Sequence, residues 1–361
     1  MSPQWFLDGV RGLSEIDTDA GVAALEGARG RRMRNVTARM PMPRWIERSC
    51  GVFCLAAVTL LPANAVGTSN PSPVGAAGMQ VAITFDDLPE HGDLPPGISR
   101  AGVARSIIHT LKVRHAPPIY GFINADGLAG DPADGEVLRL WRAAGYSLGN
   151  HTFSHPDANV VTASTFEQDV LADESTLQKY MGGHNWHWLR LPYLHEGDTP
   201  EKRDEIASFI KMHRYHIAQV TLSFDDYAYN DPYARCIATG NAAAVAWLKQ
   251  SFLDRASVDI LAAHKMSELL YGRDIKHVLL MHIGAFDAVM LPKLLDMYKR
   301  RGVELISLPD SESDPAYKNA DEQQFDWGGT MLEEQMIARG IPIPDFANRD
   351  DALDQIDALC K

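Results

Sequence analysis

The sequence lacks an excess of positive charge, low-complexity tracts and internal repeats. Its formal net charge is −13 at pH 7, and nucleic acids or anionic membranes are bound through basic patches, so we expect neither as a partner. The absence of repeats argues against an architecture built from short repeated units. The 361 residues are 45% hydrophobic and 22% charged. Such a chain can bury a large core, as one α/β domain or as one domain with an extension.

The chain also lacks an apolar run of the roughly 20 residues that span a bilayer. Its N-terminal part nevertheless has the three parts of a secretory signal peptide: Arg44 and Arg48, then the apolar residues 50–61, then the small residues 63–65. We therefore predict a signal peptide at about residues 42–65, cleaved after residue 65, and an exported protein, periplasmic or secreted. A membrane anchor is the weaker alternative because the run is too short, and no span is expected after cleavage.

Residues 1–39 fit no such signal, and Met40 or Met42 would start a normal signal peptide, so the translation start is left open. Cysteine is scarce as well: of four cysteines, Cys236 and Cys360 follow the predicted cleavage site. An exported compartment permits a disulfide between them. The sequence does not tell whether their Cα atoms come within reach of each other.

Beyond a Pro/Gly/Ser-rich leader at residues 66–78, short apolar strands alternate with helical patterns. Strands are predicted at residues 81–85, 118–124, 146–149, 186–191, 216–220, 277–281 and 303–308. Helices are predicted at residues 98–113, 134–144, 164–180 (opened by a capping box at Ser164), from Thr199–Pro200, 241–273 (one helix or two) and 286–301. Units of this kind predict an α/β fold with a parallel sheet closed, or nearly closed, into a barrel. Residues 310–361 are predicted to form a helical, acidic extension.

Chemically suggestive side chains follow the predicted strand ends, where α/β barrels build their active sites. Asp86 and Asp87 end the first strand, and as neighbours along an extended chain they should point in different directions. A solvated turn is the plain alternative for such a pair. His151 and His155 follow the third strand. At four residues apart on a helical turn they would share one face, so both could reach one ion.

One carboxylate and two neutral imidazoles are a ligand set for a divalent metal that keeps open positions for water and substrate. The second carboxylate is then left where a general base would sit. Two further strands deliver Arg190, whose guanidinium can hold a carboxylate bidentately, and His282, which is placed to protonate a leaving group. The set points to metal-assisted hydrolysis, although each residue alone could be structural.

These motifs, Thr-Phe-Asp-Asp, His-Thr-x-x-His, Arg-x-Pro-Tyr and Leu-x-His in this order, resemble the polysaccharide deacetylase family (the NodB-homology domain, carbohydrate esterase family 4). The resemblance covers about residues 79–309. It implies a distorted (β/α) barrel of about seven strands and metal-dependent removal of acetyl groups from amino sugars.

Carried over by position, the resemblance implies that Asp87, His151 and His155 bind one divalent ion. Zn²⁺ is the first choice, with Co²⁺, Mn²⁺ and Ni²⁺ as alternatives. Asp86 would be the general base, paired with Arg190.

The remaining roles also follow from the resemblance. His282 would be the general acid, and the backbone N–H of Tyr193 would hold the oxyanion. Leu280 would line the acetyl pocket, and Pro192, Tyr193 and Tyr227 would contact the substrate.

One motif departs from the family pattern Asp-x-x-Asp-Trp. Ser223 takes the place of the first Asp, and Tyr227 replaces Trp. Asp226 is the best candidate to orient His282, with Asp225 left open. The third motif also lacks the Gly that often follows its aromatic residue. These departures bear on the substrate cleft and leave the metal chemistry intact.

We therefore expect an exported hydrolase of linear amides, a deacetylase of N-acetylglucosamine glycans of the chitin or peptidoglycan type. The alternatives are an O-acetyl esterase on xylan-type glycans and an inactive glycan-binding protein on the same fold. The exact glycan and the oligomeric state are not set by the sequence.

Overall fold

The computed structural model describes residues 78–130, 135–318, 328–344 and 349–361. The predicted signal peptide, the segment before it and the leader up to residue 77 lie outside these ranges. Among the described residues, no helix combines the length and apolar character needed to cross a membrane.

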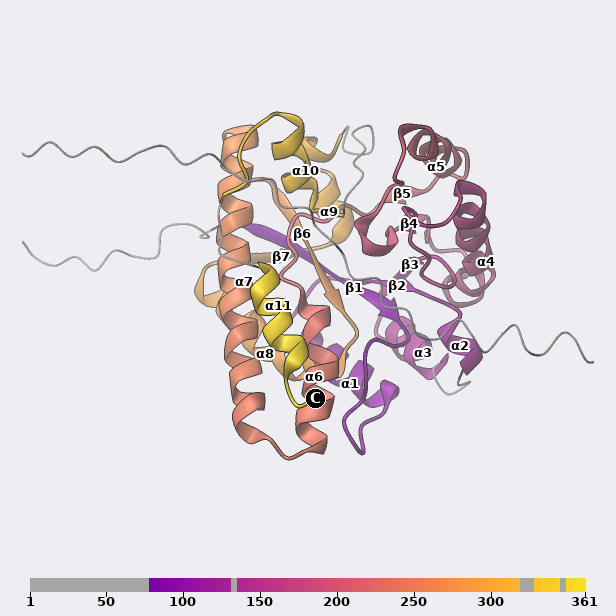
Figure 1. The fold of residues 1–361 in the computed structure, drawn as a ribbon. Coiled ribbons are helices and arrows are strands. Elements are labelled where there is room, and N and C mark those ends of the chain that lie inside the picture. Colours follow the sequence, from indigo (N-terminus) through magenta and orange to yellow (C-terminus); the bar gives the residue numbers. More distant parts are fainter. Residues whose placement is uncertain (1–77, 131–134, 319–327, 345–348) are drawn as a thin grey trace, which may run out of the picture. The chain divides into compact units, whose positions relative to one another are not determined.

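Seven parallel strands form the centre of the molecule (Figure 1). They are β1 (Gln80–Leu88), β2 (Tyr120–Ile123), β3 (Ser147–Asn150), β4 (Trp188–Leu189), β5 (His216–Ile217), β6 (Lys276–His282) and β7 (Glu304–Ile306). Their order is β5-β4-β3-β2-β1-β6, and β7 pairs with the first residues of β1. The chain beyond β5 then reaches β6 through a parallel bridge between Leu222 and Leu279. The two edges of the sheet therefore approach each other, and the predicted distorted barrel of about seven strands is confirmed.

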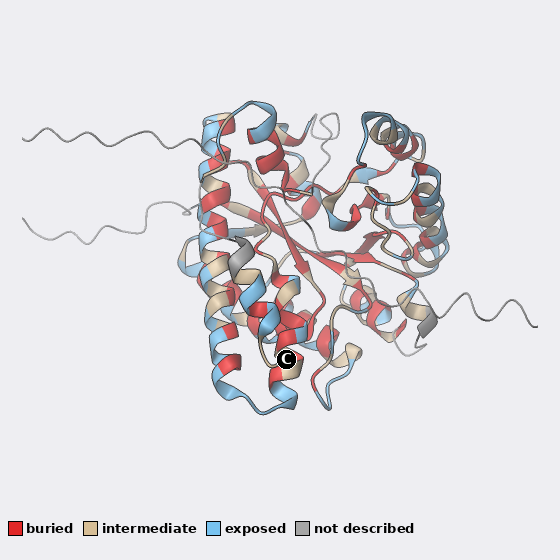
Figure 2. Ribbon diagram, viewed as in Figure 1, coloured by how far each residue is buried: buried red, intermediate tan, exposed pale blue. Residues whose placement is uncertain are grey.

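Helices pack around this sheet. They are α1 (Arg100–Val113), α2 (Gly127–Gly130), α3 (Gly135–Ala143), α4 (Ala163–Met181), α5 (Pro200–Met212), α6 (Asn230–Ala238), α7 (Ala242–Tyr271), α8 (Ala285–Arg300), α9 (Leu308–Glu312), α10 (Met331–Ala338) and α11 (Arg349–Ala358). Short 3-10 turns form η2 (Pro192–Leu194), η3 (Asp226–Tyr229) and η4 (Pro315–Tyr317). The strands and the inward faces of the helices are buried (Figure 2), as parallel sheets covered by helices require.

Several predicted boundaries need correction. The helix expected to open at Ser164 begins at Ala163, because the Thr162 side chain caps it by accepting the Thr165 N–H. The stretch expected to hold one or two helices is the single helix α7. Helix α6, which the sequence did not predict, follows η3 directly.

The C-terminal extension is helical, as predicted, and a disulfide links it to α6. Cys236 in α6 and Cys360 are bonded, with their Cα atoms 5.2 Å apart. Helix α11 accordingly packs against α6 and η3. The last described segment of the chain thus supports the element that carries Asp226.

Candidate active site

A cavity of about 430 Å³ opens at the carboxyl ends of the strands. It is lined by Asp86, Asp87, His91, His151, His155, Leu191, Tyr193, Leu194, Ser223, Asp225, Tyr227, Leu280, His282 and Gly328. Most of the residues that the sequence singled out therefore meet in one place. Arg190 and Asp226 lie behind its wall and are fully buried.

Asp87 directs one carboxylate oxygen at both predicted histidine ligands. Its Oδ1 lies 3.4 Å from His151 Nε2 and 3.6 Å from His155 Nε2. This oxygen is buried and accepts no hydrogen bond in the structure, although a buried polar atom normally has a partner. Two ligand atoms at 2.0–2.2 Å from a tetrahedral zinc ion stand roughly 3.3–3.6 Å apart. The unpaired oxygen and the two imidazoles therefore fit a divalent ion.

The pKa values of Asp87 and His155 also favour metal binding. Burial raises the pKa of Asp87, but the neighbouring His151 and the hydrogen bond from His91 outweigh burial, and the net pKa is well below its usual value. Burial, together with the neighbouring His151, lowers the pKa of His155 to about 4. An ionised carboxylate and a neutral imidazole are the forms that bind metal.

The two histidines do not lie on a helical turn, contrary to the prediction. Residues 151–155 form a loop in which Thr152 and His155 have φ values of 64° and 57°. Asn124 fixes this loop by donating to the carbonyls of His151 and Thr152, at 2.6 and 3.0 Å. The His151 ring is oriented from behind, because its Nδ1 lies 2.7 Å from the Arg190 carbonyl. Because Thr152 and His155 have left-handed backbones, both imidazoles point toward Asp87 although the segment is not helical.

Asp86 is held by Arg190 at the floor of the cavity. Arg190 Nη1 donates to Asp86 Oδ2 at 3.3 Å, and its Nη2 donates to Thr84 Oγ1 at 3.1 Å. The guanidinium of Arg190 therefore donates to two different side chains, and it does not bind one carboxylate bidentately. Phe122 lies against the guanidinium, with its ring centre 4.9 Å away. Asp86 Oδ1 is buried with no hydrogen-bond partner.

His282 contacts Asp226, and Asp225 is occupied elsewhere. The Nδ1 of His282 lies 3.1 Å from Asp226 Oδ1, and its backbone N–H donates to Oδ2 at 2.7 Å. Asp225 instead pairs with Arg255. Burial lowers the pKa of His282, but Asp226 raises it through its charge and hydrogen bond, with Asp87 and Asp86 adding to this, to about 10. The contact with Asp226 therefore favours the charged imidazolium form of His282.

A buried network below Asp226 was missed by sequence reasoning. Asp287 is fully buried, and burial together with the charge of Asp226 raises its pKa well above its usual value. Asn230 donates to Asp287 Oδ2 at 2.8 Å and accepts the Phe286 N–H at 2.9 Å. A Cβ at residue 284 would stand 2.0 Å from the Asn230 side chain, so only Gly284 fits there. Nothing in the spacing of these residues marks them in the sequence.

The predicted substrate contacts are mostly at the cavity wall. Leu280 is 7% exposed and lines it, whereas Tyr193 and Tyr227 are 57% and 45% exposed at its mouth. Tyr193 adopts a left-handed backbone with φ of 58°. Pro192 is buried in η2 and does not line the cavity. It can act on substrate only by setting the backbone beside Tyr193.

Four further cavity residues were not predicted, namely His91, Leu191, Leu194 and Gly328. His91 lies four residues beyond Asp87, in the loop that follows β1, and contacts it; this short spacing was the signal that could have found it. Gly328 comes from the C-terminal extension, and a Cβ there would stand 2.1 Å from the Tyr193 carbonyl oxygen. The extension thus forms part of the cavity wall, which no local pattern in the sequence indicates.

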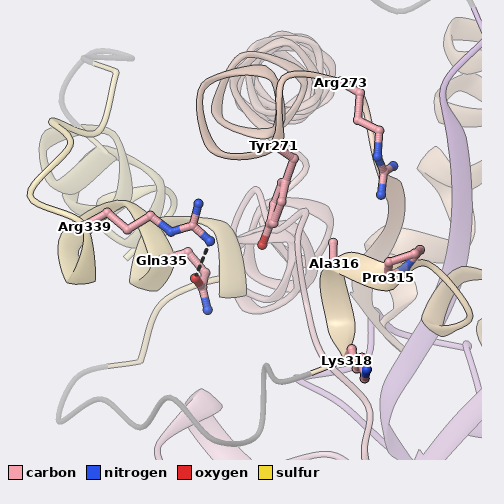
Figure 3. A pocket seen from close by; sticks show the side chains of 7 residues that line it. All are labelled: Tyr271, Arg273, Pro315, Ala316, Lys318, Gln335 and Arg339. Carbon is pink, nitrogen blue, oxygen red and sulfur yellow. Dashed lines mark hydrogen bonds between the residues drawn. The ribbon is translucent and has the colours of Figure 1, made fainter.

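A second cavity, of about 340 Å³, contains none of these residues. It is lined by Tyr271, Arg273, Pro315, Ala316, Lys318, Gln335 and Arg339 (Figure 3). Its arginines are already bonded within the protein: Arg273 to Asp314, and Arg339 to the Leu270 carbonyl and Gln335. We assign no chemistry to it.

Comparison with known proteins agrees with the motifs. Residues 75–209 match the family model described as polysaccharide deacetylase, which confirms the predicted resemblance. A probable peptidoglycan-N-acetylglucosamine deacetylase from Arthroderma benhamiae is 21% identical over 236 residues, 65% of this chain and 44% of that protein. The chain thus spans less than half of that relative's length.

Two solved structures are among those with similar chains. The chitin deacetylase from the fungal pathogen Colletotrichum lindemuthianum is 20% identical, with 67% of this chain and 92% of that chain covered and a TM-score of 0.45. A CE4 family pseudoenzyme from Bacillus anthracis is 12% identical, with 66% of each chain covered and a TM-score of 0.45.

Proposed function

From the polysaccharide deacetylase match of residues 75–209, we propose that this protein is a metal-dependent hydrolase that removes acetyl groups from an N-acetylated glycan. One observation carries the proposal. The unpaired Oδ1 of Asp87, facing two imidazoles, lies in the same cavity as an unpaired carboxylate oxygen of Asp86 and a charged His282. Such a cavity holds a metal ligand set, a base and an acid together.

Each of these residues has a separate role in the proposed amide hydrolysis. A divalent ion held by Asp87, His151 and His155 would polarise the acetyl carbonyl and favour ionisation of water. Asp86 accepts the proton of the attacking water through its free Oδ1. His282 then donates its proton to the departing amine nitrogen.

Two parts of the cavity wall serve the acetyl group. The backbone N–H of Tyr193 meets the negative charge that develops on the carbonyl oxygen. Leu280, which is buried at the wall, provides an apolar surface for the acetyl methyl. Both assignments extend the family resemblance to this chain's own residues.

The proposal also covers the identity of the ion, the substrate and the location of the protein. We propose Zn²⁺ as the ion, N-acetylglucosamine units of chitin or peptidoglycan type as the substrate, and export directed by residues 42–65. The support for export is the signal-peptide pattern, and the disulfide between Cys236 and Cys360 is compatible with it.

The test is acetate release from chitooligosaccharides, peptidoglycan and acetylxylan, with metal content measured on the same samples. We expect release from an N-acetylated glycan, loss with a chelator and recovery with added Zn²⁺. Release from acetylxylan alone would make the protein an O-acetyl esterase. A loaded protein that binds one of these glycans and releases no acetate from any of them would be an inactive glycan-binding protein.

A further inference from the structure

We propose that His91 is a positioning residue of the metal site: it donates from Nδ1 to Oδ2 of Asp87 and thereby turns Oδ1 toward the ion. The inference rests on the proposed function, because it needs Asp87 to be a metal ligand. Nδ1 lies 2.7 Å from Oδ2. Oδ1 of the same carboxylate is the atom that faces His151 and His155.

The geometry separates this role from that of a ligand. Asp87, His91 and His282 also bring three possible ligand atoms within 4.8 Å of one another, so a second ion could be imagined there. However, 2.7 Å between His91 Nδ1 and Asp87 Oδ2 is a hydrogen-bond length for a charged acceptor. It is shorter than the roughly 3.3–3.6 Å between two ligands of one tetrahedral zinc ion. His91 therefore binds the carboxylate directly.

The other ring nitrogen agrees with this assignment. His91 Nε2 lies 3.3 Å from the Tyr227 carbonyl oxygen, which is also an acceptor. Each ring nitrogen therefore faces an acceptor, to which it can only donate. The contact to the carboxylate is shorter and has a charged acceptor, so Nδ1 carries the hydrogen.

The loop that presents His91 is fixed independently of Asp87. Arg100 donates to the carbonyls of His91 and Gly92, at 3.0 and 2.7 Å, and pairs with Glu90 at 3.0 Å. The backbone at His91 is therefore set by α1. The His91 side chain is 18% exposed, so its bond to Asp87 is largely shielded from competing water.

His91 also contacts the proposed acid. Its ring centre lies 4.6 Å from that of His282. Because Asp226 engages Nδ1 of His282, the second ring nitrogen is the one left for the substrate. His91 thus contacts the proposed metal ligand through its hydrogen and lies beside the ring of the proposed acid.

Three variants test whether the hydrogen-bond donor of His91 supports the metal site. His91→Asn keeps an N–H donor near the position of Nδ1, His91→Phe keeps a ring but no donor, and His91→Ala keeps neither. His264→Ala is the matched control, because His264 also pairs with a carboxylate four residues away, Glu268, and its side chain is 24% exposed. His151→Ala is the reference for loss of a ligand.

The measurement is the Zn²⁺ affinity of each purified protein, by competition with a chromogenic chelator, with circular dichroism to establish folding. We expect His91→Ala and His91→Phe to bind about 10–100-fold more weakly, the usual effect of removing a hydrogen bond to a ligand. His91→Asn should recover most of the affinity, and His264→Ala should match the wild type.

Other outcomes overturn specific statements. Wild-type affinity in His91→Phe would overturn the positioning role, and loss as complete as in His151→Ala would make His91 a ligand. If His151→Ala itself keeps the ion, the proposed function fails. If His151→Ala loses it and the His91 variants do not, only this inference fails.

Discussion

Asp226 accepts two hydrogen bonds from His282, one from the backbone N–H at 2.7 Å and one from ring Nδ1 at 3.1 Å. The first fixes where β6 ends, and the second fixes which ring nitrogen faces the cavity. One buried carboxylate thus sets both the position and the charge of the proposed acid.

Replacing Asp226 with Asn should move the alkaline limb of the activity profile to lower pH. Burial lowers the pKa of His282, and the Asp226 charge raises it to about 10. Activity that needs the imidazolium is present below that pKa and lost as pH rises through it. Without the carboxylate the loss should begin nearer neutrality. The measurement is kcat/KM for N-deacetylation across the neutral and alkaline range. An unchanged limb would show that another group sets it.

His151→Ala or His155→Ala should remove the metal ion. The two ligands that remain compete poorly with water, whereas three make a standard site. Elemental analysis of the dialysed variants gives the result directly. Retention of about one ion per chain in either variant would refute the ligand set.

Asp86→Asn should keep the metal and lose most of the rate, by about 10²–10⁴-fold for a lost general base. Asn is nearly the same size, so the contact with Arg190 changes little in shape. Asp87→Asn is the control and should lose the ion. If the two variants exchange these properties, the roles of the adjacent carboxylates are reversed.

His282→Ala should harm amide hydrolysis more than hydrolysis of an aryl acetate. An amine must be protonated as it leaves, whereas an aryl oxide is a good leaving group without help. The ratio of kcat/KM on the two substrates measures this selectivity. Equal losses on both would mean that His282 positions the substrate or supports the ion.

Cys360→Ser should lower the free energy of unfolding. The disulfide links residues 124 positions apart, and a loop of that length restricts the unfolded chain by up to about 4–5 kcal/mol, often less in practice. Urea unfolding with and without reductant measures the difference. Reductant should lower the wild-type midpoint to that of the variant and leave the variant unchanged. A wild-type midpoint that does not respond to reductant would contradict a stabilising bond.

The order of strands and helices could be predicted because each strand is a short apolar run, after which the spacing of apolar residues changes to that of a helix. The residues at strand ends could be predicted for the same reason, since parallel strands end at one edge. The prediction of local backbone geometry was wrong. Four-residue spacing suggested a helical turn for His151 and His155, but the left-handed φ values of Thr152 and His155 depend on Asn124, which is remote in sequence.

The sequence favoured Asp226 over Asp225 as the partner of His282 and left Asp225 open, and the structure shows the contact with Asp226. Asp225 has a φ of 58°, and this turn sends it to Arg255 and its neighbour to His282. Gly328 could not be foreseen because its contact with Tyr193 depends on how the C-terminal extension folds back. Tertiary contacts decided each of these cases.

The alignment of β1 with β6 places Asp86 directly opposite His282. Neighbouring strands stand about 4.8 Å apart, so the separation of the proposed base from the proposed acid is set by the backbone ladder rather than by loops. The loops around the cavity can therefore diverge while the spacing of this pair stays constant. By the same rule, one residue inserted within β6 would turn the imidazole to the opposite face of an otherwise intact sheet.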